Sequence, residues 1–185
     1  TNFILLDEPF CSLDMHVKLK LRSELPNILK GCNASGLMVT HDPEEAMSIC
    51  DKVAVMNEGK IHQIDKPINL LNNPNTKFVS SFILGNNILK IEKKGDALVS
   101  CLGFINSTGL DNINFKSMSI SPKFISIKRS DSGNATVISK EFLGEFFVYK
   151  VTINDDILRV KTNINNLLNN GDKCFLSINK NSYYF

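Results

Sequence analysis

The chain has 185 residues, of which 43% are hydrophobic and 22% charged, and its formal net charge is +2. This composition is typical of an ordinary globular protein and allows one large or two small domains. Such a small net charge gives no indication of nucleic acid or of an anionic membrane surface as a partner.

The cysteine pattern argues against a disulfide-bonded or zinc-binding protein, and the hydropathy argues against a membrane-spanning one. The cysteines are odd in number, widely scattered and never paired as C-x-x-C, which favours reduced thiols in a cytosolic compartment over disulfides or zinc. No apolar run approaches the roughly 20 residues needed to cross a bilayer, and no signal peptide opens the chain.

The first element expected is a short strand over residues 3–6, four apolar residues that predict burial on both faces, as in a parallel sheet. It ends in Asp7, Glu8 and Pro9. Ligands bind at the carboxyl ends of parallel strands, so Asp7 is a candidate Mg²⁺ ligand and Glu8 a candidate base for an attacking water. A solvated strand end is the alternative.

A helix is expected over residues 15–31, with Asp14 as its N-cap and Gly31 closing it. Pro26 inside this pattern predicts a kink or an early end. A second core strand, residues 36–40, ends at His41, where an imidazole can donate a hydrogen bond to a phosphate.

The next helix begins at Asp42-Pro43-Glu44-Glu45. Asp42 is a cap candidate, Pro43 suits the first helical position, and the two glutamates complement the helix dipole. These structural roles are sufficient, so no chemistry is assigned to the three carboxylates.

A strand hairpin with its turn at Glu58-Gly59 follows, and then two short helices and a break at Gly85-Asn86. These strands are expected at residues 52–57 and 60–65, and the helices at 67–71 and 76–84.

From Asn87 onward the pattern changes to short β-like segments without a long amphipathic helix, which predicts a small barrel or sandwich. Val148, Lys150 and Thr152 alternate with Tyr149, Val151 and Ile153, so one face of this segment can be buried. Asn154-Asp155-Asp156 should turn the chain. The expected strands are residues 88–92, 97–101, 117–120, 124–128, 135–142, 146–153, 157–162 and 174–179.

Three motifs in order resemble the ATP-binding-cassette (ABC) ATPases: the strand ending in Asp7-Glu8-Pro9, then Ser12-Leu13-Asp14, then Val39-Thr40-His41-Asp42. In that family they correspond to the Walker B strand, the D-loop and the switch histidine. The resemblance implies ATP and Mg²⁺ as cofactors, with Asp7 at the metal. Glu8 would be the general base, and His41 would contact the γ-phosphate. Ser12, Leu13 and Asp14 would lie at a dimer interface.

The rest of the chain resembles one branch of that family. Residues 56–61 and 67–83 are similar to the cassette tail of importers for sugars, polyamines, sulfate and ferric iron. Residues 119–123 and 141–145 resemble the transport-associated OB (TOBE) domain that follows it. Ser121 stands where that domain usually has arginine, so a salt bridge of that arginine is not carried over.

The fold class expected is therefore α/β: a partial P-loop NTPase (ABC cassette) in residues 1–85, followed by a small all-β, OB-like (TOBE) domain in residues 86–185. The P-loop motif G-x-x-x-x-G-K-[ST] is absent from the sequence, as is the L-S-G-G-Q signature. We expect an N-terminally truncated chain that is inactive alone and binds ATP poorly.

As an intact protein, the resemblance implies an ATP-hydrolysing subunit that energises import from the cytoplasmic face of the membrane as a peripheral protein. Its partners would be a second ATPase subunit in a homodimer, transmembrane permease subunits and, indirectly, an external substrate-binding protein, but no nucleic acid. The transported substrate stays open.

Two alternatives remain. One is a non-catalytic regulatory or binding β-barrel attached to a degenerate cassette fragment. The other is a P-loop ATPase of DNA repair or translation, which is disfavoured because the β-rich tail is a transporter feature.

Overall fold

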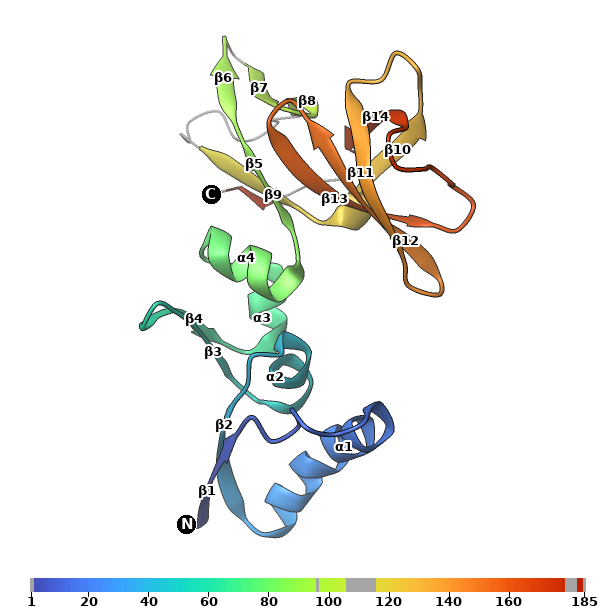
Figure 1. Ribbon diagram of the computed structural model, residues 1–185. Helices are drawn as coiled ribbons and strands as arrows, with labels where there is room; N and C mark the ends of the chain where they lie inside the picture. The colour runs from blue at the N-terminus through green and yellow to red at the C-terminus, as the bar shows by residue number, and fades with distance from the viewer. Residues whose placement is uncertain (1, 96, 106–115, 179–182, 185) are drawn as a thin grey trace. The chain divides into compact units, whose positions relative to one another are not determined.

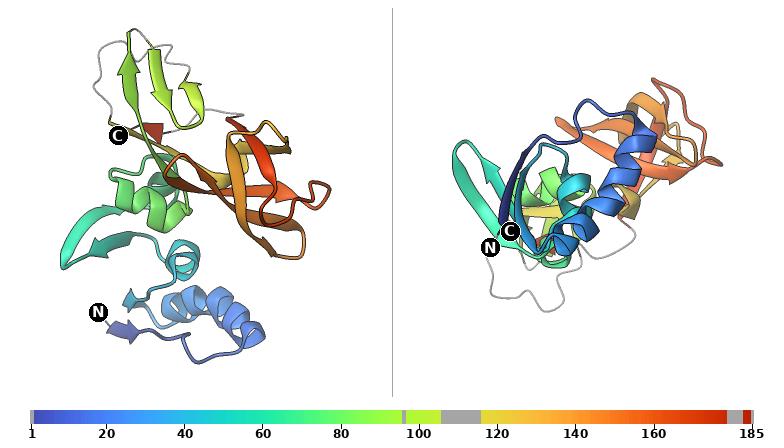
Figure 2. Two further views of the ribbon diagram at one scale, coloured as in Figure 1. Left: turned by 45° about the horizontal axis from the view of Figure 1, so that its top comes forward. Right: turned by 90° about the horizontal axis from the view of Figure 1, so that it is seen from below.

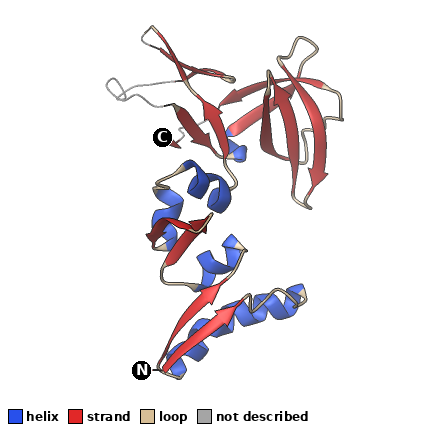
Figure 3. Ribbon diagram, turned by 60° about the vertical axis from the view of Figure 1, so that its left-hand side comes forward, coloured by secondary structure: helices blue, strands red, loops and turns tan. Residues whose placement is uncertain are grey.

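A computed structural model describes residues 2–95, 97–105, 116–178 and 183–184 (Figure 1). The chain divides into two compact units, Thr1–Ile83 and Leu84–Phe185. The first is mixed α/β and the second is built almost wholly of antiparallel strands (Figure 3).

The first unit begins with a parallel β-α-β crossover. Strands β1 (Asn2–Asp7) and β2 (Ala34–Val39) pair in parallel, and helix α1 (Met15–Gly31) connects them (Figure 2). The side chain of Leu29 lies over Gly36, where an added Cβ would come within 3.2 Å of the leucine Cδ1. The helix therefore packs on the sheet through its C-terminal half.

The prediction that the first of these strands is buried on both faces is wrong, and the second strand is exposed as well. Phe3, Leu5, Leu37 and Val39 are 62%, 70%, 55% and 56% exposed. The sheet has only these two strands in the described part of the chain, and α1 contributes no fully buried residue. A strand becomes buried on both faces only when other layers cover it.

Helix α1 has the predicted bounds and cap. The Asp14 carboxylate accepts hydrogen bonds from the backbone N–H of His16 and Val17, at 3.0 and 3.1 Å. An early end at Pro26 is wrong, because the helix continues to Gly31. The left-handed residue that follows the helix is Asn33, with φ +49°, and not the glycine.

The remainder of this unit comprises α2 (Pro43–Ile49), β3 (Val53–Asn57), β4 (Lys60–Asp65), α3 (Pro67–Asn72) and α4 (Lys77–Leu84). Glu58 and Gly59, with φ of +49° and +72°, form the two-residue loop between β3 and β4. Two consecutive positive φ values match the twist of a hairpin.

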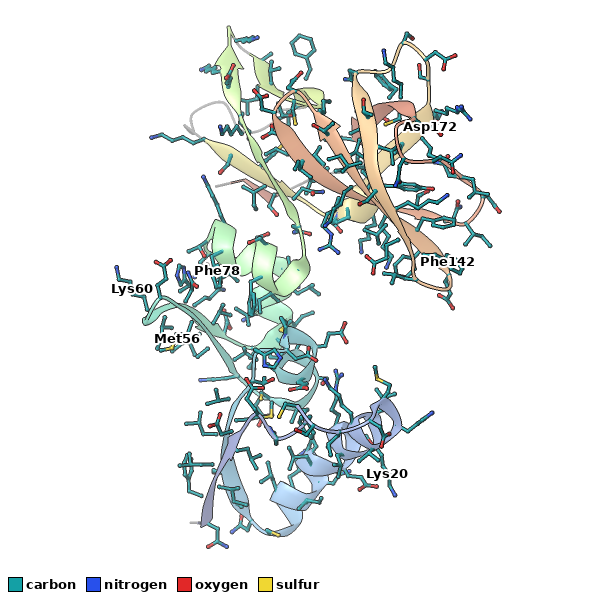
Figure 4. All side chains as sticks on the ribbon, in the orientation of Figure 1. Lys20, Met56, Lys60, Phe78, Phe142 and Asp172 are labelled. Atoms are coloured by element: carbon teal, nitrogen blue, oxygen red, sulfur yellow. The ribbon has the colours of Figure 1, made fainter. Side chains whose placement is uncertain are left out.

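A small core joins these elements, with Val53, Val55, Leu70 and Val79 buried. Phe78 of α4 stacks at a tilt on His62, with ring centroids 5.0 Å apart, and lies beside the hairpin (Figure 4). Within the described ranges, no helix has the length and apolar character required to cross a membrane.

The second unit holds three antiparallel sheets. One has five strands in the order β10-β14-β11-β12-β13, and the others have the orders β15-β9-β5 and β6-β7-β8. The short helix η1 (Pro122–Phe124) precedes β10. The strands are β5 (Asn87–Lys90), β6 (Glu92–Lys94), β7 (Ala97–Ser100), β8 (Gly103–Ile105), β9 (Ser117–Ile120), β10 (Ile125–Arg129), β11 (Ala135–Phe142), β12 (Phe146–Ile153), β13 (Asp156–Asn163), β14 (Lys173–Ile178) and β15 (Tyr183–Tyr184).

The prediction that one face of β12 is buried is confirmed, and it is the face of Tyr149, Val151 and Ile153, which are at most 1% exposed. The Tyr149 hydroxyl donates to the carbonyl of Asn166 at 2.9 Å and accepts from the N–H of Leu168 at 3.1 Å. The core of this unit is thus apolar with a satisfied phenol at its centre.

Asn87 closes one edge of the large sheet. Its amide nitrogen donates to the carbonyl of Arg159, and its amide oxygen accepts from the Arg159 N–H, both at 2.8 Å. The side chain thereby pairs with edge strand β13 as a neighbouring strand would. Three short strands, β6, β8 and β15, were not predicted separately, and Asn179, predicted as a strand end, lies outside the described residues.

Candidate active site

The predicted site residues gather where β1 and β2 end. Asp7, the last residue of β1, pairs in register with Val39, the last residue of β2. The Glu8 N–H donates to the Val39 carbonyl at 2.9 Å and extends the pairing by one bond. The next side chains of both strands therefore emerge together at one end of the sheet.

Glu8 and His41 are in direct contact. The Nδ1 atom of His41 lies 2.8 Å from the Oε1 atom of Glu8, and the imidazole is 78% exposed. This hydrogen bond, reinforced by the negative charge of Glu8, raises the pKa of His41 above its ordinary value. A protonated imidazole has two N–H donors, so Nε2–H stays available to a ligand when Nδ1–H binds Glu8.

The backbone of Glu8 is unusual. Its φ of +46° lies in the left-handed region, which residues other than glycine adopt uncommonly. Such conformations occur preferentially at functional sites, where surrounding contacts hold them. Here the bond from the Glu8 N–H to β2 contributes to that hold.

Asp7 presents an exposed carboxylate. Within the described residues it has no hydrogen-bond or ion-pair partner, and they contain no cluster of three or more His, Cys, Asp or Glu side chains that could hold a metal. A single carboxylate still suits Mg²⁺, which is commonly bound through one or two carboxylates plus substrate phosphates and water.

Ser12, Leu13 and Asp14 lie on the turn between Glu8 and helix α1. Backbone bonds from Cys11 to Glu8 and from Leu13 to Phe10, both 3.3 Å, shape this turn, and Phe10 anchors it at 3% exposure. The side chains of Ser12 and Leu13 are exposed, whereas the Asp14 carboxylate is occupied as the helix cap.

A polar network that was not predicted from the sequence involves Thr40 and Asp42, the residues on either side of His41. Glu45 is 3% exposed, and its carboxylate accepts from the Lys18 ammonium at 2.7 Å and from the Thr40 hydroxyl at 2.5 Å. Lys18 also lies 2.9 Å from Asp42 Oδ2, and the Thr40 hydroxyl accepts from the Asp42 N–H at 3.1 Å. The first-turn position of Glu45 had a sufficient local explanation and gave no signal of burial.

Lys18 and Asp42 of this network each favour the charged form of the other. The Glu45 hydrogen bond, followed by that of Asp42, raises the pKa of Lys18. Burial alone would raise the pKa of Asp42, but hydrogen bonds from Lys18 and from the Glu44 N–H hold it below its usual value. The pairing of Lys18 with Asp42 therefore favours the charged form of both groups, and the buried Glu45 carboxylate has the hydrogen-bonding partners that burial of a polar group requires.

Comparison with known proteins identifies relatives, although no family model matches the chain. The spermidine/putrescine import ATP-binding protein PotA of Ureaplasma parvum is 35% identical over 180 residues, covering 93% of this chain and 34% of that protein. The PotA of Mesoplasma florum is 36% identical over 158 residues, which are 76% of this chain and 42% of the relative. The sulfate/thiosulfate import protein CysA 2 of Chromobacterium violaceum is 39% identical over 110 residues, 60% of this chain and 30% of its own length.

The chain thus spans between 30% and 42% of the length of these curated relatives, in their C-terminal part. The motifs that resemble ABC ATPases and the similarity across most of the chain lead to the same family. The chain is a relative of the ATP-binding subunits of PotA- and CysA-type ABC importers, matched over part of their length.

Proposed function

We propose that this chain is part of the ATP-hydrolysing subunit of an ABC importer. Residues 1–85 would be the C-terminal part of a P-loop NTPase cassette and residues 86–185 a TOBE-like β domain. The observation that carries the proposal is the 2.8 Å hydrogen bond between Glu8 and His41 at the carboxyl ends of two parallel strands. The similarity to importer ATPases supports it independently.

Glu8 is the general base in this proposal. His41 occupies Oε1, so Oε2 is left to accept a proton from the water that attacks the terminal phosphate. A carboxylate within hydrogen-bond reach of such a water typically contributes about 10²–10⁴-fold to the rate. The partial exposure of Glu8 gives the water access.

His41 and Asp7 have different roles toward the phosphates of ATP. His41, whose pKa Glu8 raises, donates Nε2–H to the terminal phosphate when the imidazole is protonated, while Nδ1–H stays on Glu8. The exposed Asp7 carboxylate would hold Mg²⁺, which supplies charge neutralisation to the phosphates when bound. Without it, Asp7 and Glu8 repel the same phosphates.

The proposal requires a P-loop from another polypeptide segment, because the motif is absent from these 185 residues. We expect the chain alone neither to hydrolyse ATP nor to bind it well. The working unit would be a peripheral homodimer on the cytoplasmic face, with Ser12, Leu13 and Asp14 at the dimer interface. It would engage permease subunits directly and an external binding protein indirectly.

Spermidine or putrescine is the solute we favour. Two relatives that align with more than three quarters of this chain are spermidine/putrescine import proteins, whereas the sulfate/thiosulfate relative aligns with 60%. The proposal thus commits to polyamine import, with sulfate, sugar or ferric iron as the outcomes that would contradict it in an uptake assay.

The test of the catalytic assignment is a chimera. This chain is fused behind the part of the Ureaplasma parvum relative that precedes the aligned region, and phosphate release from Mg·ATP is measured. Glu8→Gln should lower turnover by about 10²–10⁴-fold and spare ATP binding, since the amide keeps the size but cannot take the proton. Glu44→Gln, an exposed acid outside the site, is the matched control and should keep turnover. Near-normal turnover in Glu8→Gln would show that another group is the base.

A second candidate is a regulatory binding module in the β-rich unit. A hollow of about 540 Å³ lies between the β10 and β13 regions, with Lys123, Lys128 and Lys161 in its lining and no carboxylate among its described lining residues. Calorimetric titration of the chain with Mg·ATP and, separately, with citrate separates the two functions. Citrate binding that is lost when the three lysines become glutamines, together with an inactive chimera, would favour the binding module.

A further inference from the structure

We propose that Glu45 and Lys18 are positioning residues that hold His41 against Glu8. The inference deepens the proposed function and rests on it, since holding the imidazole matters to catalysis only if His41 acts there. Neither residue touches the nucleotide in this proposal. They act through Thr40 and Asp42, which flank His41 in the chain.

The buried carboxylate of Glu45 is held in place by two partners. It is 3% exposed, and each of its oxygens has a partner: Lys18 on Oε1 and Thr40 on Oε2. A buried charge is tolerated only when it is paired and hydrogen-bonded, so this group cannot leave its position without losing both partners. Its location is therefore better determined than that of the exposed imidazole.

The Thr40 hydroxyl transmits this position to the turn. It donates to Glu45 and accepts from the N–H of Asp42, so one hydroxyl spans His41 from the residue before to the residue after. Asp42 is held at the same time by Lys18 through Oδ2 and caps helix α2 through Oδ1. The backbone on both sides of His41 is thus fixed, and its side chain leaves the turn toward Glu8.

Lys18 ties this turn to the other side of the pair. It lies near the start of α1, whose cap Asp14 ends the turn that begins at Glu8. One ammonium group therefore connects the segment that carries Glu8 with the two carboxylates that hold the His41 turn. Loss of Lys18 should uncouple the two segments without removing either catalytic side chain.

The test is nitrogen NMR of the 185-residue chain labelled with ¹⁵N-histidine. The chain has three histidines, so His16 reports on the start of α1 and His62 on the β3–β4 hairpin, in the same spectrum as His41. The carboxylates of Glu8, Glu45 and Asp42 all raise the pKa of His41 through their negative charge. Glu8→Gln provides the reference signal of an unpaired imidazole.

Glu45→Gln and Lys18→Met should both shift the His41 ring nitrogens toward the Glu8→Gln reference, while His62 stays in place. Lys18→Arg should restore the His41 signal, and Glu44→Gln should leave it unchanged. The proposal is overturned if His41 is unmoved in both variants, if Lys18→Arg displaces it as far as Lys18→Met, or if all three histidines move together in every variant.

This readout needs no nucleotide. An inactive chimera, or one indifferent to Glu8→Gln, would contradict the proposed ATPase role and leave the NMR result standing. A negative NMR result with a Glu8-dependent chimera would remove only the positioning role.

Discussion

The Glu8–His41 contact makes a residue-level prediction about pH. The hydrogen bond raises the pKa of His41, so its stabilising effect is fully present below the unfolded value of about 6.5 and is lost as the pH rises through the higher folded value. Glu8→Gln should lower the pKa of His41 in an NMR titration, and Glu44→Gln should not. An unchanged pKa in Glu8→Gln would mean that the contact does not persist in solution.

At this same scale, the caps could be predicted from the sequence and the buried network could not. Asp14 and Asp42 bind N–H groups two or three residues away, so the local pattern contains everything that determines them. The burial of Glu45 depends on Lys18, which lies on a different helix. A first-turn glutamate looks the same in sequence whether it faces solvent or a lysine.

At the scale of elements, Gly133 is critical for the approach of β11 to β14. A Cβ at this position would lie 2.2 Å from the carbonyl oxygen and 2.8 Å from the backbone nitrogen of Cys174. Backbone cannot yield as a side-chain tip can, so Gly133→Ala should lower the free energy of unfolding by about 1–3 kcal/mol or more.

Urea denaturation of the chain measures this effect, with the exposed neighbour Asn134→Ala as control. Equal stability of the two variants would mean that the β10–β11 loop can move away from β14.

Element positions followed from local patterns, whereas their burial did not. Helix α1 and the β3–β4 hairpin have the expected places because a cap, a helical period and a two-residue turn are local signals. Pro26 did not end α1, and Leu29 beyond it packs over Gly36. Strands of two or three residues, such as β8, are too short to show an alternation.

At the scale of the molecule, the division into two units predicts a protease-sensitive junction. The second unit starts at Leu84, and Asn87 is 7% exposed with both amide atoms bound to β13. Limited proteolysis should leave a protected fragment that begins close to Asn87, identified by its N-terminal sequence. Uniform digestion of residues 87–178 would contradict an independently folded β unit.

The first unit exposes large apolar side chains to solvent. Both strands of its parallel sheet expose large side chains, including Phe3 and Leu37. Contiguous apolar surface on a protein usually marks a site of association. This exposure supports the proposal that a further polypeptide segment, carrying the P-loop, completes the cassette.

The two hydrogen bonds between the Asn87 side chain and β13 also bear on how fast the second unit folds. It joins positions 72 residues apart, and β10 pairs with β14 from Ile125 to Ile178, so much of the unit forms only after long loops close. Sheets with such non-local pairing refold in milliseconds to seconds, roughly a thousandfold slower than helical bundles. Stopped-flow tyrosine fluorescence, to which the buried Tyr149 contributes in a chain without tryptophan, should show this slow phase. The Asn87 hydrogen bonds to β13 should form only after the β11–β12–β13 meander. Asn87→Ala should therefore accelerate unfolding and leave the refolding rate nearly unchanged.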